Sequence, residues 1–160
     1  SKGNIPLTDL VYDVNNILSR DLKGLYYFST AAILQINLQT NKISIVNAGH
    51  PPIYFFNGNE YIRYESMGPL IGLFEDSEYE KIDLEIKKNN ILLCYTDGVT
   101  EAVNSNEEMY SEKRLLQVLN KTTTESPSDI LFSLVGDIYE FTEYGKQKDD
   151  ITAICIKAIQ

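Results

Sequence analysis

The sequence predicts an α+β domain, and three observations lead to this class. Runs of aromatic and β-branched residues are separated by short turn sequences, a pattern typical of antiparallel strands joined by hairpins. Amphipathic segments of helical period come before and after these runs. Strands and helices do not alternate as they would in a parallel sheet. We therefore expect helices layered on antiparallel sheets.

Three helices are expected. In residues 7–22, apolar side chains recur at helical spacing, and Pro6 and Gly24 flank the segment as start and stop signals. Two more helices are expected at about 111–120 and 127–141, with Ser126 as the candidate N-cap of the last one. The side chains predicted to form the buried stripe of the first helix are Leu7, Leu10, Val11, Val14, Ile17, Leu18 and Leu22.

Strands are expected in residues 27–38, 43–46, 53–56, 60–64, 81–87, 91–95 and 151–156. Thr40-Asn41 and Asn57-Gly58-Asn59 suit hairpin turns, because Asn and Gly tolerate a positive φ. Residues 81–87 alternate strictly between apolar and charged side chains, which indicates one solvated face. Residues 91–95 show no alternation, which indicates a strand buried on both faces.

Composition limits the function. The chain has 160 residues, the length of one domain, and 14 basic against 23 acidic residues give a net charge of −9. This balance argues against a surface for nucleic acid or anionic lipid, since both require clustered positive charge. We find no targeting signal and no apolar run of the roughly 20 residues that a membrane span needs. We therefore expect a cytoplasmic domain without direct membrane contact, which could also be the cytoplasmic end of a membrane-bound sensor protein.

The strongest candidate for chemistry is Tyr95-Thr96-Asp97-Gly98. An apolar strand ends in a carboxylate, and the Gly that follows can turn sharply and let other groups approach its backbone. A carboxylate in this position is suited to bind a hard cation. The alternative is that Asp97 only caps the turn that follows it.

Asp149 and Asp150 form a second candidate, at the start of the last predicted strand. Adjacent carboxylates repel each other unless a cation or a basic partner offsets the charge. Because side chains alternate along a strand, only one of the two can point into a given site. Asp97 could share a divalent metal with Asp149 or Asp150. The alternative is a solvated acidic turn.

The only histidine of the chain, His50, lies in Asn47-Ala48-Gly49-His50-Pro51-Pro52. It could act as an acid, a base or a metal ligand, or its imidazole could bond to nearby backbone in a structural turn. A structural zinc site is not expected, because Cys94 and Cys155 lie apart in apolar runs, as buried thiols in a reducing compartment do. The stretch from Gly68 to Gly72 lacks the Lys of a phosphate-binding loop and is expected to be a packed turn.

Five stretches in this order resemble the stage-II-sporulation-E-type branch of the metal-dependent (PPM, type 2C) protein serine/threonine phosphatases. They are Phe28-Ser29-Thr30-Ala31, Asn47-Ala48-Gly49-His50-Pro51-Pro52, Gly68-Pro69-Leu70-Ile71-Gly72, Tyr95-Thr96-Asp97-Gly98-Val99-Thr100-Glu101-Ala102 and Asp149-Asp150-Ile151-Thr152. The resemblance spans the chain from about residue 28 to residue 152.

The resemblance implies a four-layer α-β-β-α sandwich of two antiparallel sheets, with two Mn²⁺ or Mg²⁺ ions at one end. On matching positions, Asp97 and Asp149 would be metal ligands and Asp150 a neighbouring candidate, with Gly98 and His50 in supporting or structural roles. A metal-activated water would hydrolyse phosphoserine or phosphothreonine. The implied substrate is a phosphorylated regulatory protein, such as an anti-sigma-factor antagonist, and a sensor domain would lie upstream in the parent chain.

Two features depart from the family pattern. Asn89-Asn90 stands where the family commonly has Gly-Asp. An earlier motif, Asp-x-Ser-Gly-His-Gly or close to it, should precede the first helix, and the chain starts after that point with Ser1. We therefore expect residues 1–160 to be one N-terminally incomplete phosphatase domain that lacks its first strands and is poorly active or inactive alone. The alternatives are an inactive phosphatase-like binding domain and an acidic interaction domain without metal.

Overall fold

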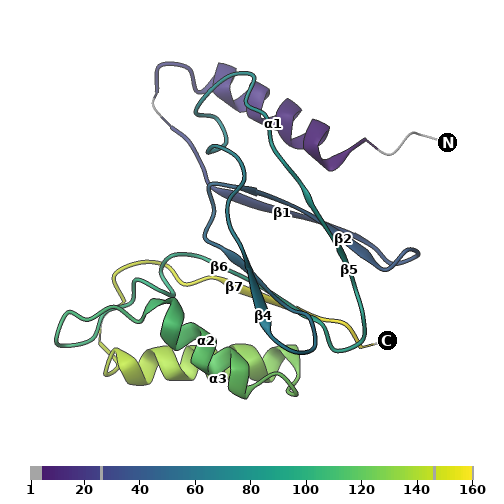
Figure 1. The fold of residues 1–160 in the computed structure, drawn as a ribbon. Helices are drawn as coiled ribbons and strands as arrows, with labels where there is room; N and C mark the ends of the chain where they lie inside the picture. Colours follow the sequence, from purple (N-terminus) through teal and green to yellow (C-terminus); the bar gives the residue numbers. More distant parts are fainter. Residues whose placement is uncertain (1–4, 26, 146, 160) are drawn as a thin grey trace. The chain divides into compact units, whose positions relative to one another are not determined.

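The computed structural model describes residues 5–25, 27–145 and 147–159. The chain divides into two compact units, which we describe separately (Figure 1). The first unit comprises residues 1–52 and 65–86, and the second comprises residues 53–64 and 87–160. Two antiparallel sheets and three helices confirm the predicted α+β class. The expectation of a single domain stays a prediction.

The first unit is a three-stranded sheet with one helix on it. Its strands are β1 (Ala31–Asn37), β2 (Lys42–Ala48) and β5 (Ile82–Glu85), in the order β1-β2-β5. The turn between β1 and β2 places Asn41 at a φ of 52°, as the Asn in this turn predicted. Helix α1 (Leu7–Asp21) packs on the apolar end of the sheet, where Leu7 and Val11 contact a cluster that includes Val46 and Ala48.

The predicted buried stripe of α1 is wrong in part. Leu10, Val14 and Ile17 are 46%, 41% and 54% exposed, whereas Asn15 and Asn16 are buried. The Asn15 amide donates to the carbonyl of Phe74 (2.8 Å), and its oxygen accepts the Gly72 N–H (2.9 Å). The helix is therefore rotated toward the loop of residues 72–76, where the buried Asn15 and Asn16 amides find backbone hydrogen-bond partners.

The second unit is a four-stranded sheet with two helices on it. Strands β3 (Ile53–Phe56), β4 (Tyr61–Tyr64), β6 (Ile91–Tyr95) and β7 (Ala153–Lys157) are arranged in the order β4-β3-β6-β7. Every residue of β6 is buried, as its continuous apolar run predicted. Helices α2 (Ser111–Lys121) and α3 (Pro127–Phe141) cover the sheet with a core that includes Leu115, Leu119, Ile130 and Leu134.

Local signals located several elements correctly. The hydroxyl of Ser126 accepts the N–H of Asp129 and caps α3, as predicted. Strand β1, in contrast, begins at Ala31 and not at residue 27, because Ser29 pairs instead with Ile71 in an isolated bridge. Cys94 and Cys155 are free thiols, and burial raises the pKa of the Cys94 thiol to about 12. Within the described residues, no helix is both long and apolar enough to cross a membrane.

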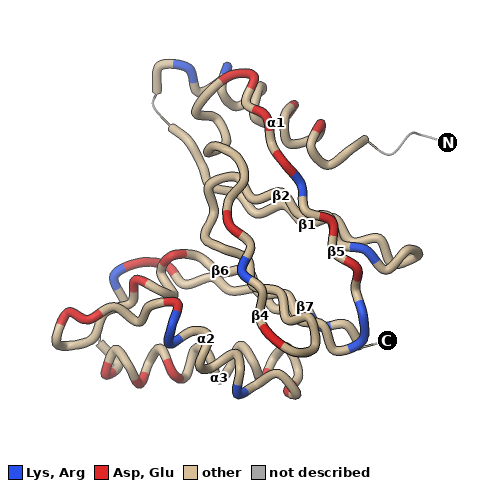
Figure 2. The backbone as a smooth tube through the Cα atoms, in the orientation of Figure 1, with Lys and Arg blue, Asp and Glu red and all other residues tan. Residues whose placement is uncertain are grey.

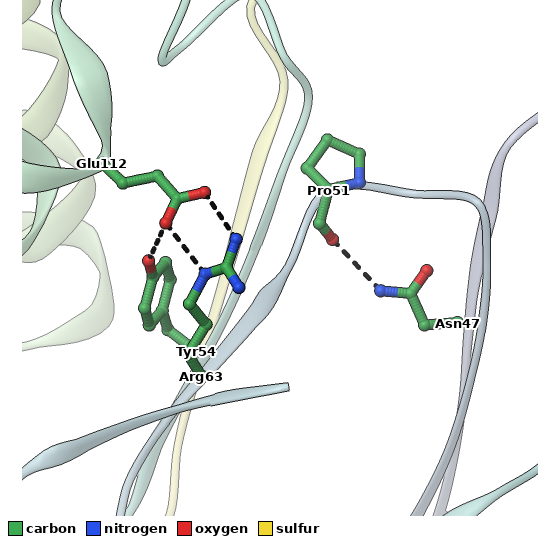
Figure 3. Close-up of polar contacts among 5 residues, drawn as sticks. All are labelled: Asn47, Pro51, Tyr54, Arg63 and Glu112. Atoms are coloured by element: carbon green, nitrogen blue, oxygen red, sulfur yellow. Dashed lines mark hydrogen bonds and ion pairs between the residues drawn. The ribbon is translucent and has the colours of Figure 1, made fainter. Parts of the chain in front are cut away.

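A carboxylate joins α2 to the sheet of the second unit. Glu112 accepts two hydrogen bonds from the Arg63 guanidinium (2.9 and 3.0 Å) and one from the hydroxyl of Tyr54 (2.7 Å) (Figure 3). Tyr54 is only 1% exposed, so its hydroxyl has lost water as an alternative partner. The hydrogen bonds from Arg63, with a smaller contribution from Tyr54, hold the pKa of Glu112 below its usual value against the opposing effect of burial.

We expect Glu112→Gln to lower the free energy of unfolding by about 1 kcal/mol at pH 7, because solvent partly screens this pair. A carboxylate whose folded pKa is lowered stabilises the protein above its unfolded pKa, and this contribution is lost as the pH falls through the folded pKa. The difference between wild type and variant in urea unfolding should therefore shrink below about pH 4. Glu60→Gln, in the exposed β3–β4 turn, is the control and should show no such difference. An equal difference at pH 7 and pH 3 would contradict the assignment.

Candidate metal centre

Asp97 lies immediately after the buried strand β6, in a tight turn of the second unit. The N–H of Val99 donates to the carbonyl of Thr96 (3.0 Å), and the N–H of Glu101 donates to that of Asp97 (2.8 Å). The Asp97 side chain is exposed, whereas Gly98 and Val99 are buried. Buried residues thus lie on both sides of the turn, in β6 and at Val99, while the Asp97 carboxylate between them is exposed.

Thr96 holds the segment of Asp149 and Asp150 beside this turn. Its N–H donates to the carbonyl of Thr152 (2.9 Å), and its hydroxyl accepts the Thr152 N–H (2.9 Å). The same hydroxyl donates to the carbonyl of Asp150 (3.1 Å). These bonds continue the antiparallel pairing of β6 with β7 by one residue beyond the strands. The three candidate carboxylates therefore lie at one end of one strand pair.

Gly98 permits a backbone contact that other residues would prevent. A Cβ atom built on Gly98 would lie 2.4 Å from the carbonyl oxygen of Asp150 and 3.5 Å from that of Asp149. Real Cβ atoms do not approach a backbone oxygen this closely. The carbonyl of Gly98 also accepts a hydrogen bond from the Gln147 side chain (3.3 Å). Gly98 therefore sets how closely the two acidic segments approach.

The carboxylates have hydrogen-bonding capacity left for a cation. One oxygen of Asp97 accepts the Gly98 N–H (3.1 Å), and one oxygen of Asp149 accepts the Asp150 N–H (2.7 Å). Exposed carboxylates of this kind suit Mn²⁺ or Mg²⁺, which prefer oxygen ligands. Among the described residues, however, no three His, Cys, Asp or Glu side chains are grouped closely enough to hold a metal by themselves. The residues fit the role of a partial ligand set.

His50 belongs to a hydrogen-bonded turn of the first unit. The side-chain oxygen of Asn47 accepts the His50 N–H (3.0 Å), and its amide donates to the carbonyl of Pro51 (3.2 Å, Figure 3). The hydroxyl of Thr30 lies 3.3 Å from Nδ1 of His50. The Asn47 side chain thus holds the turn, and the His50 imidazole lies beside the Thr30 side chain. The carboxylates belong to the second unit, and the role of His50 at a metal stays a prediction.

The glycine-rich stretch after residue 67 packs against the histidine turn within the first unit. The hydroxyl of Ser66 accepts the Gly49 N–H (2.7 Å) and donates to the carbonyls of Asn47 and Gly68. Gly49 has a φ of 68°, and a Cβ there would lie 2.3 Å from the Leu70 side chain. The histidine stretch (47–52) and the glycine-rich stretch (68–72), which the sequence singled out separately, thus pack against each other. Ser66 is not among the residues that the sequence singles out, since an isolated Ser carries no spacing signal.

Comparison with solved structures gives the class of the fold. The chain superposes on the SiaA-PP2C domain of Pseudomonas aeruginosa with a TM-score of 0.82 at 15% identity, covering 94% of this chain and 60% of that one. It superposes on the phosphatase domain of the cell fate determinant SpoIIE from Bacillus subtilis (Mn presoaked) with a TM-score of 0.66 at 20% identity, covering 99% and 69%. The fold is that of PP2C-type phosphatase domains.

The family follows from the sequence. The model of the stage II sporulation protein E (SpoIIE) family matches residues 1–159, and the chain belongs to this family. The phosphoserine phosphatase RsbP of Bacillus subtilis is 32% identical over 101 residues, which are 62% of this chain and 25% of that protein. The chain spans between 22% and 25% of the length of three curated relatives that it matches.

We expect Gly98→Ala to destabilise the protein by about 1–3 kcal/mol in urea unfolding, because the new methyl group forces the backbone of Asp150 away. Gly136→Ala is the matched control. Gly136 lies in α3, and no atom lies within 4 Å of the position of its Cβ, so this variant should be as stable as wild type or more stable. Equal stability of Gly98→Ala and wild type would contradict the close approach described here.

Proposed function

We propose that the chain is part of a metal-dependent phosphatase domain that hydrolyses phosphoserine or phosphothreonine on a regulatory protein. The observation that carries this proposal is the pair of acidic segments, Asp97 and Asp149-Asp150, held together by Thr96 and by the contact at Gly98. Membership of the SpoIIE family and a fold of the PP2C type support it. The runner-up is an inactive phosphatase-like binding domain.

Asp97 and Asp149 are the proposed metal ligands. Each has one oxygen engaged by a backbone N–H, which orients the carboxylate, and both residues are exposed. Asp150 is a neighbouring carboxylate whose charge adds to the attraction for a cation. A bound Mn²⁺ or Mg²⁺ pair supplies an activated water and charge compensation for the phosphoryl group. The protein then needs no nucleophile of its own.

Metal ions also account for how an acidic chain could bind a phosphorylated substrate. The net charge of −9 repels phosphate at a distance, and a divalent cation reverses the sign of the local field at the carboxylates. The name of the relative RsbP, a phosphoserine phosphatase, supports a phosphoserine substrate. An anti-sigma-factor antagonist is the proposed kind of regulatory protein, and an upstream sensor domain is the proposed regulator.

The remaining metal ligands are proposed to come from elsewhere in the parent protein. The chain covers 60% of the SiaA-PP2C domain, so a domain of that size contains more residues than these 160. The described residues supply two acidic segments but no group of three ligands. A carboxylate from an upstream Asp-containing motif would complete the set.

We expect the parent protein to hydrolyse p-nitrophenyl phosphate and a phosphoserine peptide in the presence of Mn²⁺, and the 160-residue chain to do so barely or not at all. Asp97→Asn and Asp149→Asn should each reduce turnover by the parent protein about 100-fold or more, because each removes a charged ligand. Addition of EDTA should abolish turnover. The control is Asp13→Asn, an exposed carboxylate on α1, which should retain full activity.

Calorimetric titration with Mn²⁺ separates the two candidate functions. Mn²⁺ binding that is weakened by Asp97→Asn, together with turnover, supports the phosphatase. Binding of a phosphorylated protein without turnover supports the alternative, an inactive phosphatase-like binding domain. An inactive parent protein whose Mn²⁺ binding is unchanged by Asp97→Asn refutes the metal centre, and turnover that survives EDTA refutes the mechanism.

A further inference from the structure

The outer side of α3 carries apolar residues that the core of the second unit does not use. Phe132, Val135 and Tyr139 are 76%, 37% and 51% exposed. Their spacing of three and four residues places them on one side of the helix, opposite the buried Ile130, Leu134 and Ile138. A surface helix is normally apolar only on the side that faces the core. Helix α3 is apolar on both sides, which indicates a second contact.

Tyr144 extends this surface beyond the end of the helix. Its ring stacks on that of Tyr139, with centroids 6.2 Å apart and planes 10° apart, and Tyr144 is 76% exposed. Glu143 and Tyr144 both have a left-handed backbone, with φ values of 53° and 56°, a conformation that non-glycine residues seldom adopt. We call Phe132, Val135, Gly136, Tyr139 and Tyr144 the α3 outer face.

Gly136 lies in the middle of this face, and the fold does not need a glycine there. No atom lies within 4 Å of the position that its Cβ would occupy, and its φ is not positive. Glycine inside a helix lowers stability relative to alanine. A missing side chain at the centre of an exposed apolar stripe lets the backbone of a partner approach closely. Gly136 therefore points to a contact with another polypeptide segment.

The charge around the α3 outer face selects the partner. Residues 127–145 contain four carboxylates, Asp129, Asp137, Glu140 and Glu143, and no Lys or Arg. Asp137 is engaged by Arg114, whereas Asp129 and Glu140 are exposed along one border of the face. Acidic positions along α3 are red in Figure 2. An apolar stripe with an acidic border complements an apolar stripe with a basic border.

We propose that the α3 outer face binds an amphipathic helix that has an apolar stripe bordered by Lys or Arg. The anchors Phe132, Val135, Gly136 and Tyr139 have the spacing that helix-to-helix recognition uses. A second copy of the chain fits less well. An antiparallel pairing of two such faces centred on Gly136 would set Asp129 opposite Glu143, which places like charges together, and would set the apolar Phe132 opposite the charged Glu140. This interaction is separate from the proposed phosphatase function.

The proposal can be tested with a designed peptide and the 160-residue chain. The probe is a fluorescein-labelled helical 18-mer with Leu along one face and Lys along its borders. Two control peptides have Glu in place of Lys, or the same composition in scrambled order. We expect fluorescence anisotropy to show that the Lys peptide binds at least about tenfold more tightly than either control, and that its affinity falls with added NaCl.

Variants locate the binding site. Phe132→Ser should weaken binding about tenfold or more by removing an anchor, and Gly136→Leu should do the same by blocking close approach. Glu140→Lys should reduce the preference for the Lys peptide over the Glu peptide several-fold. Gly136→Ala should raise Tm by about 1–4 °C and still weaken binding, a combination that loss of folding cannot produce. Phe74→Ser, which removes a phenylalanine of similar exposure (61%) in the first unit, is the matched control and should bind as wild type does.

Three outcomes would overturn the proposal. The first is equal binding of the Lys peptide to wild type, Phe132→Ser and Gly136→Leu. The second is equal binding of the Lys peptide and the scrambled peptide, which would reflect net charge alone. The third is a dimer in sedimentation experiments that Phe132→Ser dissociates, which would make a second copy the occupant of the face. Circular dichroism spectra of all variants check that each is folded.

Discussion

The backbone of Gly98 lies against the carbonyl groups of Asp149 and Asp150, and the acidic edge of the second unit depends on this contact. Strands β6 and β7 are paired over five residues, and Thr96 continues the pairing to Thr152. The register of this pair sets the position of the carboxylates along the edge, while Gly98 sets their separation. Strand β6 is buried along its whole length, and the close packing around it fixes the position of the strand. The turn that carries Asp97 follows this strand and is therefore held in place as well.

The acidic residues of the second unit have three different environments, although the sequence presents them alike. Glu112 and Asp137 are partly buried and accept hydrogen bonds from Arg63 or Arg114 and from the hydroxyls of Tyr54 or Tyr110. They attach α2 to the sheet and to α3. The carboxylates at the end of β6 and at the start of β7 are exposed, and Asp97 and Asp149 each accept one backbone N–H. Their negative charges at one end of one strand pair favour a cation. The exposed carboxylates of α3, Asp129 and Glu140, border the α3 outer face.

Helix α1 shows why a helical period does not decide which side of a helix is buried. Its apolar positions cover more than one side, and both choices bury some leucine or valine. The loop of residues 72–76 determines which side of α1 is buried, because its carbonyl and N–H groups form hydrogen bonds with the side chains of Asn15 and Asn16. The side-chain amides of Asn15 and Asn16 are buried, and a buried amide without a hydrogen-bond partner costs more free energy than an exposed leucine does.

The sequence by itself determined the α+β class, the positions of β3, β6 and α3, the cap at Ser126 and the turn at Asn41, because each follows from local propensity, period or backbone conformation. It also selected Asp97, Asp149 and Asp150 and their family, through motifs in a fixed order. Only the tertiary structure decided that Thr96 and Gly98 join these acidic segments, which side of α1 is buried, and that α3 exposes Phe132 and Gly136. These features depend on contacts between residues far apart in the chain, and a local pattern carries no information about them.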